Sequence, residues 1–303
     1  MQEEFIMKQQ NPIFRGIATA LITPTTPAGV DYNRLDQLID WQIAQGINAL
    51  VICGTTGESS TLTDAEHRQV MAHAIRKIDG RVPVICGTGS NETDYAVELT
   101  KSACADGADA VLVVTPYYNK TTQNGLVAMY NTIADASTKP VILYNVPSRT
   151  GISISAETYK VLSQHPNING IKEASGDFSL IAKVRSQCGD DLYIWSGNDD
   201  NTVPMMALGA LGVISVASNI VPAVTAKLCA LCLEGDFTAA TALYGKYAKL
   251  FSTLFIETNP IPVKAAMKLM DMDSGILRLP LVEISEENLA KLKAVMRDCG
   301  LNV

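Results

Sequence analysis

The sequence predicts an α/β fold, a closed (β/α)8 TIM barrel with a C-terminal all-helical appendage. Eight short apolar runs rich in β-branched residues recur along the chain, and each is followed by a turn and a stretch with helical periodicity. The runs are apolar throughout, as in parallel strands that are buried on both faces. The length of 303 residues exceeds the roughly 250 residues of a typical barrel of this kind, and the surplus can form an appendage.

The expected strands alternate with helices in the first part of the chain. They cover residues 16–22, 49–53, 82–86, 108–114, 140–146, 168–172, 192–197 and 211–216. Segments such as 31–46 and 64–80 repeat apolar residues at three- and four-residue spacing, which is typical of helices packed on a sheet. An open doubly wound sheet is the alternative, and the count of eight strand–helix units favours the closed barrel.

Only helical patterns follow the last expected strand, beyond about residue 217. The clearest helices are expected within 234–258, 260–271 and 285–300. We therefore expect a barrel that carries the active site in residues 1–232 and a C-terminal helical domain in residues 233–303.

The composition excludes several classes of function. Hydrophobic residues make up 47% and charged residues 18%, so the chain can bury a sizeable core and is not a disordered protein. A net charge of −7 argues against nucleic acid as a partner, because that binding needs a dense Lys/Arg surface. No apolar run is long enough to span a membrane, and segment 1–12 does not resemble a targeting peptide. We expect a cytoplasmic protein that binds neither nucleic acid nor membrane.

The Cys and His residues predict neither disulfides nor a metal site. The seven cysteines are scattered without a secretory signal, so we expect reduced thiols. Cys229 and Cys232 have CxxC spacing but no second pair or nearby His, and we interpret them as packing residues. The three histidines lack metal-ligand spacing. Segment 87–91 lacks the third glycine of a dinucleotide fingerprint, which argues against a nicotinamide-dependent reductase.

Reactive side chains are expected just after the strands, because barrel enzymes build their sites at the carboxyl ends of the strands. After the second strand, GTTGES (54–59) can face a small anion with its amides and Thr hydroxyls, and a plain turn is the alternative. Tyrosines in TPYYNK (115–120) and YNVPSRTG (144–151) supply hydroxyls that can pass protons. Arg149 offers a fork for a carboxylate.

Lys172 is the most informative of these residues, because it ends the sixth apolar strand, in INGIKEASGD (168–177). A lysine there is either exposed at the barrel mouth or has a lowered pKa, and an unprotonated amine is a Schiff-base nucleophile. A buried salt bridge to an acid such as Glu173 is the alternative.

These motifs together resemble one family. GTTGES, TPYYNK, YNVPSRTG, GIKEASGD and VISV, in this order and at these spacings, resemble the dihydrodipicolinate synthase family of pyruvate-dependent class I aldolases. NPIPVK (259–264) extends the match into the tail. The resemblance implies a lyase of lysine and diaminopimelate biosynthesis that condenses pyruvate with L-aspartate-4-semialdehyde. It implies no metal or organic cofactor, because an imine takes that role.

The resemblance also implies roles for single residues. Lys172 would form the imine with pyruvate, and the hydroxyls of Thr55, Tyr118 and Tyr144 would relay protons. In the family the tyrosine that matches Tyr118 is lent across a tight dimer interface, so a homotetramer built as a dimer of dimers is expected. The implied substrate-binding positions are Thr56, Arg149, Gly197 and Ile214.

Arg149 distinguishes between activities within the superfamily. It matches the arginine that binds the carboxylate of the semialdehyde, whereas Thr55 and Thr56 match residues that hold the pyruvate carboxylate. An N-acetylneuraminate lyase or a related sugar-acid aldolase is the alternative, and such enzymes generally lack this arginine. A catalytically silent barrel is a further alternative, which the full set of matching residues disfavours.

A last implication concerns regulation. Enzymes of the family that are inhibited by lysine bind it in a cleft at the dimer interface. The residues that match polar members of this cleft are Ser59, Ser60, His67, Asn91 and Tyr117. However, Asp64 stands where a lysine-sensitive enzyme commonly has histidine, and Tyr95 stands where it has the glutamate that would pair with the inhibitor's ammonium group. We therefore expect weak or absent inhibition by lysine.

Overall fold

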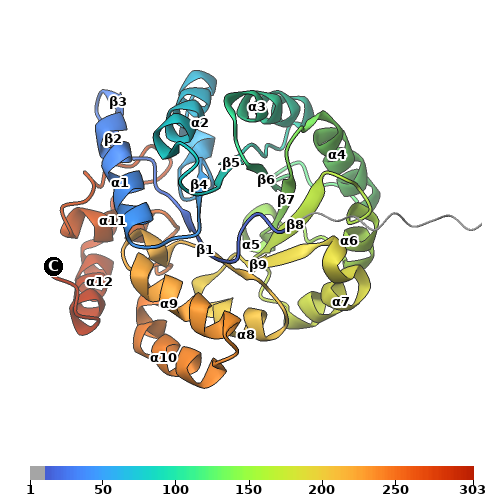
Figure 1. Ribbon diagram of the computed structural model, residues 1–303. Helices are drawn as coiled ribbons and strands as arrows, with labels where there is room; N and C mark the ends of the chain where they lie inside the picture. Colours follow the sequence, from blue (N-terminus) through green and yellow to red (C-terminus); the bar gives the residue numbers. More distant parts are fainter. Residues whose placement is uncertain (1–10) are drawn as a thin grey trace, which may run out of the picture.

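A closed barrel of parallel strands forms the centre of the computed structural model, which describes residues 11–303 (Figure 1). Around the barrel the strands follow the order β1-β10-β9-β8-β7-β6-β5-β4. They are β1 (Gly16–Ala20), β4 (Ala49–Ile52), β5 (Val84–Gly87), β6 (Ala110–Val114), β7 (Val141–Asn145), β8 (Ile168–Glu173), β9 (Tyr193–Ser196) and β10 (Gly212–Ser215). Each overlaps one of the eight expected runs, so the expected barrel is confirmed. The expectation about segment 1–12 falls almost entirely outside the described residues.

The strands are apolar throughout because both of their faces are buried. In β4, Ala49 and Val51 belong to the cluster that fills the barrel, whereas Leu50 and Ile52 pack in the layer between strands and helices. The segment ahead of β1 crosses the middle of the ring (Figure 1). There Phe14 stacks on Trp195 with ring centroids 4.9 Å apart, which plugs the barrel at this end.

The helices surround the barrel as an outer ring (Figure 1). Thr63 begins α2 with a capping box, in which its hydroxyl accepts from the Glu66 amide and the Glu66 carboxylate accepts from the Thr63 amide. The helices of the barrel region are α1 (Tyr32–Ala44), α2 (Asp64–Ile78), α3 (Thr93–Asp106), α4 (Gln123–Ala136), α5 (Pro147–Thr150), α6 (Ala156–Leu162), α7 (Phe178–Cys188), α8 (Thr202–Ala207) and α9 (Pro222–Leu233).

Three helices follow in the C-terminal segment, α10 (Phe237–Thr253), α11 (Ile261–Leu269) and α12 (Glu286–Asp298). α10 packs on α8 and α9, and α12 packs on both α10 and α11. Residues 273–278, between the last two expected helices, carry no regular structure. One feature differs from the expectation: a small antiparallel pair, β2 (Thr25–Thr26) and β3 (Gly29–Val30), precedes α1. Strands of two residues are too short to produce a periodic pattern in a sequence.

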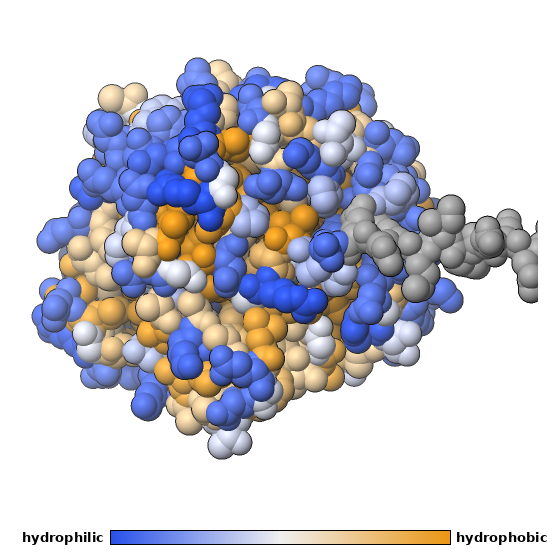
Figure 2. All heavy atoms as spheres, viewed as in Figure 1, coloured by the Kyte–Doolittle hydropathy of each residue, from blue (hydrophilic) through white to orange (hydrophobic). Residues whose placement is uncertain are grey.

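None of the helices in residues 11–303 is both long enough and apolar enough to cross a bilayer. Figure 2 shows the face seen in Figure 1, on which hydrophobic residues form separate patches with hydrophilic residues between them.

Candidate active site

A cavity of about 740 Å³ holds most of the expected site residues. Those that line it are Thr55, Thr56, Tyr144, Arg149, Lys172 and Gly197. Ile214 does not line it, because its side chain belongs to the cluster inside the barrel, and Val216 two residues later forms part of the wall. Tyr118 also lies outside this cavity.

Lys172 is buried in β8, with only 5% of its surface exposed. It pairs in register with Tyr144 of the neighbouring strand β7, and its Nζ lies 4.4 Å from the centre of the Tyr144 ring. The pKa of Lys172 is lowered to about 7, chiefly by burial; the Asp199 carboxylate opposes this shift, and the positive charge of Arg149 adds to it. The amine is therefore substantially neutral and nucleophilic near neutral pH.

Glu173, the alternative partner of this lysine, is occupied elsewhere. Successive side chains alternate across a strand, and Glu173 lies on the other side of β8 from the amine. Its carboxylate accepts hydrogen bonds from the Asn145 amide at 3.0 Å, from the Tyr159 hydroxyl at 2.8 Å and from the Ser175 backbone amide at 2.8 Å. The geometry favours the nucleophile over the buried salt bridge.

Gly197 leaves the space that the lysine side chain occupies. A Cβ atom at this position would come within 2.7 Å of the Ala174 Cβ and 3.3 Å of the Lys172 Cε. Any other residue would therefore press on the end of the lysine side chain. This provides a steric reason for a glycine at the end of β9.

Tyr144 is also buried, and its hydroxyl contacts Thr55. Burial raises the pKa of Tyr144, while Arg149 and a hydrogen bond with the Thr55 hydroxyl oppose that shift. At neutral pH the phenol is protonated, so it can donate a proton. Thr55, Tyr144 and Lys172 thus form a connected set of a hydroxyl, a phenol and a neutral amine.

The loop 54–57, which carries Thr55 and Thr56, is held between two residues with left-handed backbones. Cys53 has a φ of 54° and Glu58 has a φ of 53°. Non-glycine residues pay roughly 1–2 kcal/mol for this conformation, so surrounding contacts must maintain it. One such contact is the Thr23 hydroxyl, which donates to the Gly57 carbonyl at 2.7 Å.

The C-terminal segment forms one wall of the cavity, from residue 255 to residue 259. The Asn259 side-chain amide donates to the Thr56 hydroxyl at 3.0 Å, and the Asn259 backbone carbonyl accepts from Arg149 Nη2 at 3.1 Å. Asn259 therefore contacts both residues expected to bind carboxylates. No role for Asn259 follows from the sequence alone, although the NPIPVK motif contains it.

Asp199 is a second residue that the sequence patterns do not single out. It is buried and accepts hydrogen bonds from the Ser215 hydroxyl and from the amides of Val216 and Ala217. It stabilises the charged form of Lys172 and so limits the fall of the pKa of that lysine. Its position in SGNDD, directly after a strand, was the only sequence signal.

Tyr118 is 93% exposed, and its φ is 71°. Within one chain it therefore does not join Thr55 and Tyr144. A positive φ is uncommon for a bulky residue, and a fully exposed aromatic ring at such a position suggests a contact outside this chain. The expectation that Tyr118 completes the relay of a second subunit stays a prediction.

A second cavity of about 330 Å³ contains four residues of the expected lysine cleft, Ser59, Ser60, His67 and Tyr117. Asn91 is adjacent, because its side chain donates to the Tyr117 carbonyl at 3.1 Å. His67 Nε2 lies 2.8 Å from the Gly87 carbonyl and must donate to it, and burial lowers the pKa of His67, so the ring is neutral.

The two positions that depart from the lysine-sensitive pattern contact each other. Tyr95 lines the second cavity, and its hydroxyl hydrogen-bonds to the Asp64 carboxylate. Asp64 also pairs with Arg68 at 2.9 Å. The Asp64 carboxylate is thus already paired with a cation of its own helix.

Within the described part of the chain, His, Cys, Asp and Glu side chains do not gather into any group of three that could hold a metal ion. The polar groups that line the first cavity include an amine, hydroxyls and a guanidinium group, together with side-chain amides and the Glu257 carboxylate. These groups are suited to imine formation with a keto acid and to binding carboxylates.

Comparisons with known proteins agree with one another. The model of the dihydrodipicolinate synthetase family matches residues 13–299. A 4-hydroxy-tetrahydrodipicolinate synthase of a Thermoanaerobacter species is 50% identical over 291 residues, which is 96% of this chain and 98% of the relative. The dihydrodipicolinate synthase from Acinetobacter baumannii, solved with pyruvate, is 44% identical with a TM-score of 0.93, covering 95% of this chain and 99% of that one. The enzyme from Cyanidioschyzon merolae, solved with lysine bound, is 38% identical with a TM-score of 0.93, covering 96% and 100%.

Proposed function

Since the chain belongs to the dihydrodipicolinate synthetase family, we propose that it condenses pyruvate with L-aspartate-4-semialdehyde through an imine on Lys172. Its activity is 4-hydroxy-tetrahydrodipicolinate synthesis, a lyase reaction of lysine and diaminopimelate biosynthesis. The observation that carries the mechanism is the buried Lys172 amine, with its pKa near 7, beside the Tyr144 ring.

The reaction begins when the neutral Lys172 amine attacks the keto carbon of pyruvate. Tyr144, protonated and hydrogen-bonded to Thr55, supplies the proton with which the hydroxyl of this adduct leaves as water. The resulting protonated imine withdraws electrons from the pyruvate methyl group, which loses a proton and becomes an enamine. The enamine carbon then bonds to the aldehyde carbon of the semialdehyde, and the aldehyde oxygen takes up a proton. The amino group of the semialdehyde next attacks the imine carbon, which closes the ring and displaces the Lys172 amine.

The carboxylates of the two substrates bind to different groups of the cavity. The Thr55–Thr56 loop holds the pyruvate carboxylate, and Arg149 at the exposed mouth of the cavity binds the semialdehyde carboxylate. Gly197 provides room for the imine. The presence of Arg149 favours the synthase over an N-acetylneuraminate lyase or another sugar-acid aldolase.

The full relay in this proposal requires a second subunit. The exposed Tyr118 of one chain would enter the site of its neighbour in a homotetramer built as a dimer of dimers. We place the reaction in the cytoplasm, with no metal or organic cofactor. The proposed lysine cleft is the second cavity, and its paired Asp64 and Tyr95 leave it without a free carboxylate for the inhibitor's ammonium group.

Borohydride reduction in the presence of pyruvate, followed by peptide mass mapping, tests the imine. We expect a single adduct on Lys172. Lys264 is an internal control, because it too is buried but is held in an ion pair with Glu58. An adduct on another lysine, or none at all, would contradict the mechanism.

A second measurement separates the synthase from the lyase. Turnover of pyruvate is compared with aspartate semialdehyde and with N-acetylmannosamine as the partner substrate. We expect turnover with the semialdehyde alone. A preference for the amino sugar would establish the alternative activity.

A further inference from the structure

A buried ion pair links the pyruvate-binding loop to the C-terminal segment. Lys264 of α11 is fully buried, and its Nζ lies 2.8 Å from Glu58 Oε1. The same ammonium group donates to the carbonyls of Ile276 at 2.6 Å and Thr23 at 3.2 Å. An ammonium group has three donors, so all of them are used.

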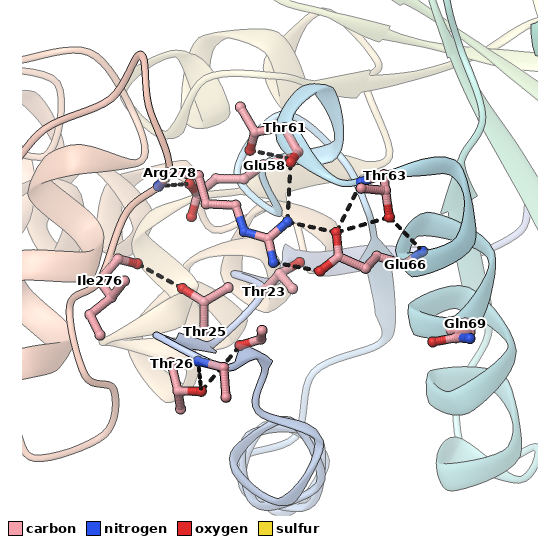
Figure 3. Close-up of polar contacts among 12 residues, drawn as sticks. Thr23, Thr25, Thr26, Glu58, Thr61, Thr63, Glu66, Gln69, Ile276 and Arg278 are labelled. Carbon is pink, nitrogen blue, oxygen red and sulfur yellow. Dashed lines mark hydrogen bonds and ion pairs between the residues drawn. The ribbon is translucent and has the colours of Figure 1, made fainter.

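The other Glu58 oxygen is also occupied. Glu58 Oε2 accepts from the Arg278 backbone amide at 3.2 Å, while the Arg278 guanidinium donates to both Glu66 oxygens at 2.7 and 2.6 Å. Figure 3 shows Arg278 between the Glu58 and Glu66 carboxylates, where the segment after α11 meets the start of α2. The C-terminal segment therefore encloses the Glu58 side chain from two directions.

Glu58 is placed where it can control the loop. It is two residues from Thr56, and its own backbone is in the strained left-handed region. Asn259, which precedes α11, donates to Thr56. The loop is thus held at Thr56 by Asn259 and at Glu58 by Lys264 of α11.

Stability alone is a weak reason for this ion pair. The cost of removing two charges from water commonly cancels their attraction, so a well-packed apolar pair would serve a stable fold equally well. A charged pair does, however, define one geometry, because each hydrogen bond has a fixed direction. That property suits a loop whose hydroxyls must meet a carboxylate.

We propose that the Glu58–Lys264 ion pair is a positioning device that sets the affinity for pyruvate by holding Thr55 and Thr56 in place. The inference rests on the proposed function, in which these two threonines bind the pyruvate carboxylate. Neither Glu58 nor Lys264 lines the cavity, so they act through the loop. The C-terminal segment is then part of the pyruvate site and not merely a cover for the barrel.

The test compares Glu58→Gln, Lys264→Met and the double variant in the full-length enzyme. Glu58→Gln keeps the size of the side chain and weakens only its hydrogen bond with the Lys264 ammonium group. Of the three variants it is therefore the one that should disturb the fold least. We expect its KM for pyruvate to rise about tenfold or more, because small displacements of binding groups have large effects. The KM for the semialdehyde should change by less than about twofold, because Arg149 is not in this contact.

Met267→Ala is the matched control. Met267 lies on the same helix and is fully buried in the core, but it makes none of the loop contacts. We expect this variant to lower Tm and to leave the KM for pyruvate unchanged. If it raises that KM as much as Glu58→Gln does, general docking of α11 is responsible and the positioning role is refuted.

The double variant separates positioning from stability. It removes both buried charges, so Tm should recover relative to Lys264→Met, whereas the KM for pyruvate should stay high. Recovery of both quantities together would show that the pair acts only through stability. An unchanged KM in Glu58→Gln would also refute the proposal.

Trapping of the pyruvate imine with borohydride distinguishes this proposal from the proposed function. If the unaltered enzyme forms an adduct on Lys172 and Glu58→Gln half-saturates at a higher pyruvate concentration, both stand. If the two proteins half-saturate at the same concentration, only the positioning role falls. Absence of the adduct in the unaltered enzyme removes the proposed function and this inference together.

Discussion

The titration of Lys172 provides a direct test of the mechanism. With a pKa of about 7 the amine is about half neutral at pH 7, whereas a lysine at the ordinary value of 10.5 is only about 0.03% neutral there. The neutral fraction should rise about tenfold from pH 6 to pH 8. It should then rise only about 1.1-fold from pH 8 to pH 10, compared with about 75-fold for an ordinary lysine.

Competitive labelling measures this fraction without relying on catalysis. The enzyme is treated with trace acetic anhydride at a series of pH values from 5.5 to 10 (about half-unit steps suffice to locate a midpoint). Peptides are then quantified by mass. The exposed Lys183 on α7 supplies the reference for an amine in solvent. A rise of more than about tenfold at Lys172 between pH 8 and pH 10 would refute the lowered pKa.

Two substitutions test the causes of the shift. Arg149→Met removes a positive charge that lowers the pKa of Lys172, so the midpoint should move up. Asp199→Asn removes a negative charge that raises it, so the midpoint should move down. Shifts in the same direction would show that the electrostatic account is wrong.

Three further predictions concern the same two cavities. Lys172→Met should raise the free energy of unfolding by up to about 4 kcal/mol at pH 7, because the folded pKa lies below the unfolded one. The penalty of the native lysine is largest below pH 7 and disappears as pH rises through 10.5; urea unfolding at pH 7 and pH 10 checks this, and an equal difference at both would contradict it. Arg149→Ala should raise the KM for semialdehyde far more than that for pyruvate in steady-state assays, and equal effects would count against its role. Lysine should inhibit weakly or not at all, because Asp64 and Tyr95 are already paired; strong inhibition at submillimolar lysine in initial-rate assays would overturn this.

The eight strands of the barrel follow from local patterns. Eight apolar runs predicted the eight strands, since a strand buried on both faces needs apolar residues at every position, as in β4. The position of Lys172 at a strand end also indicated the site, because all parallel strands direct their carboxyl ends to one side. These features depend on neighbours within a few residues, and a sequence displays them directly.

The choice between a nucleophile and a salt bridge needed the three-dimensional arrangement. Lys172 and Glu173 are adjacent in the chain, yet alternation along β8 sends them into different surroundings. The lysine lies beside Tyr144, and the glutamate lies among Asn145, Tyr159 and Ser175. Only the burial of each group shows which charge is suppressed.

The sequence by itself determined the barrel and the family resemblance, and it singled out the lysine that we propose to be reactive. The tertiary structure decided how the C-terminal segment meets the site, through Asn259 at Thr56 and Lys264 at Glu58, contacts that join residues 203 and 206 positions apart. The physical reason is that periodicity records which face of an element is buried but not which distant element covers it. That pairing is settled only when the closed barrel and its appendage pack together.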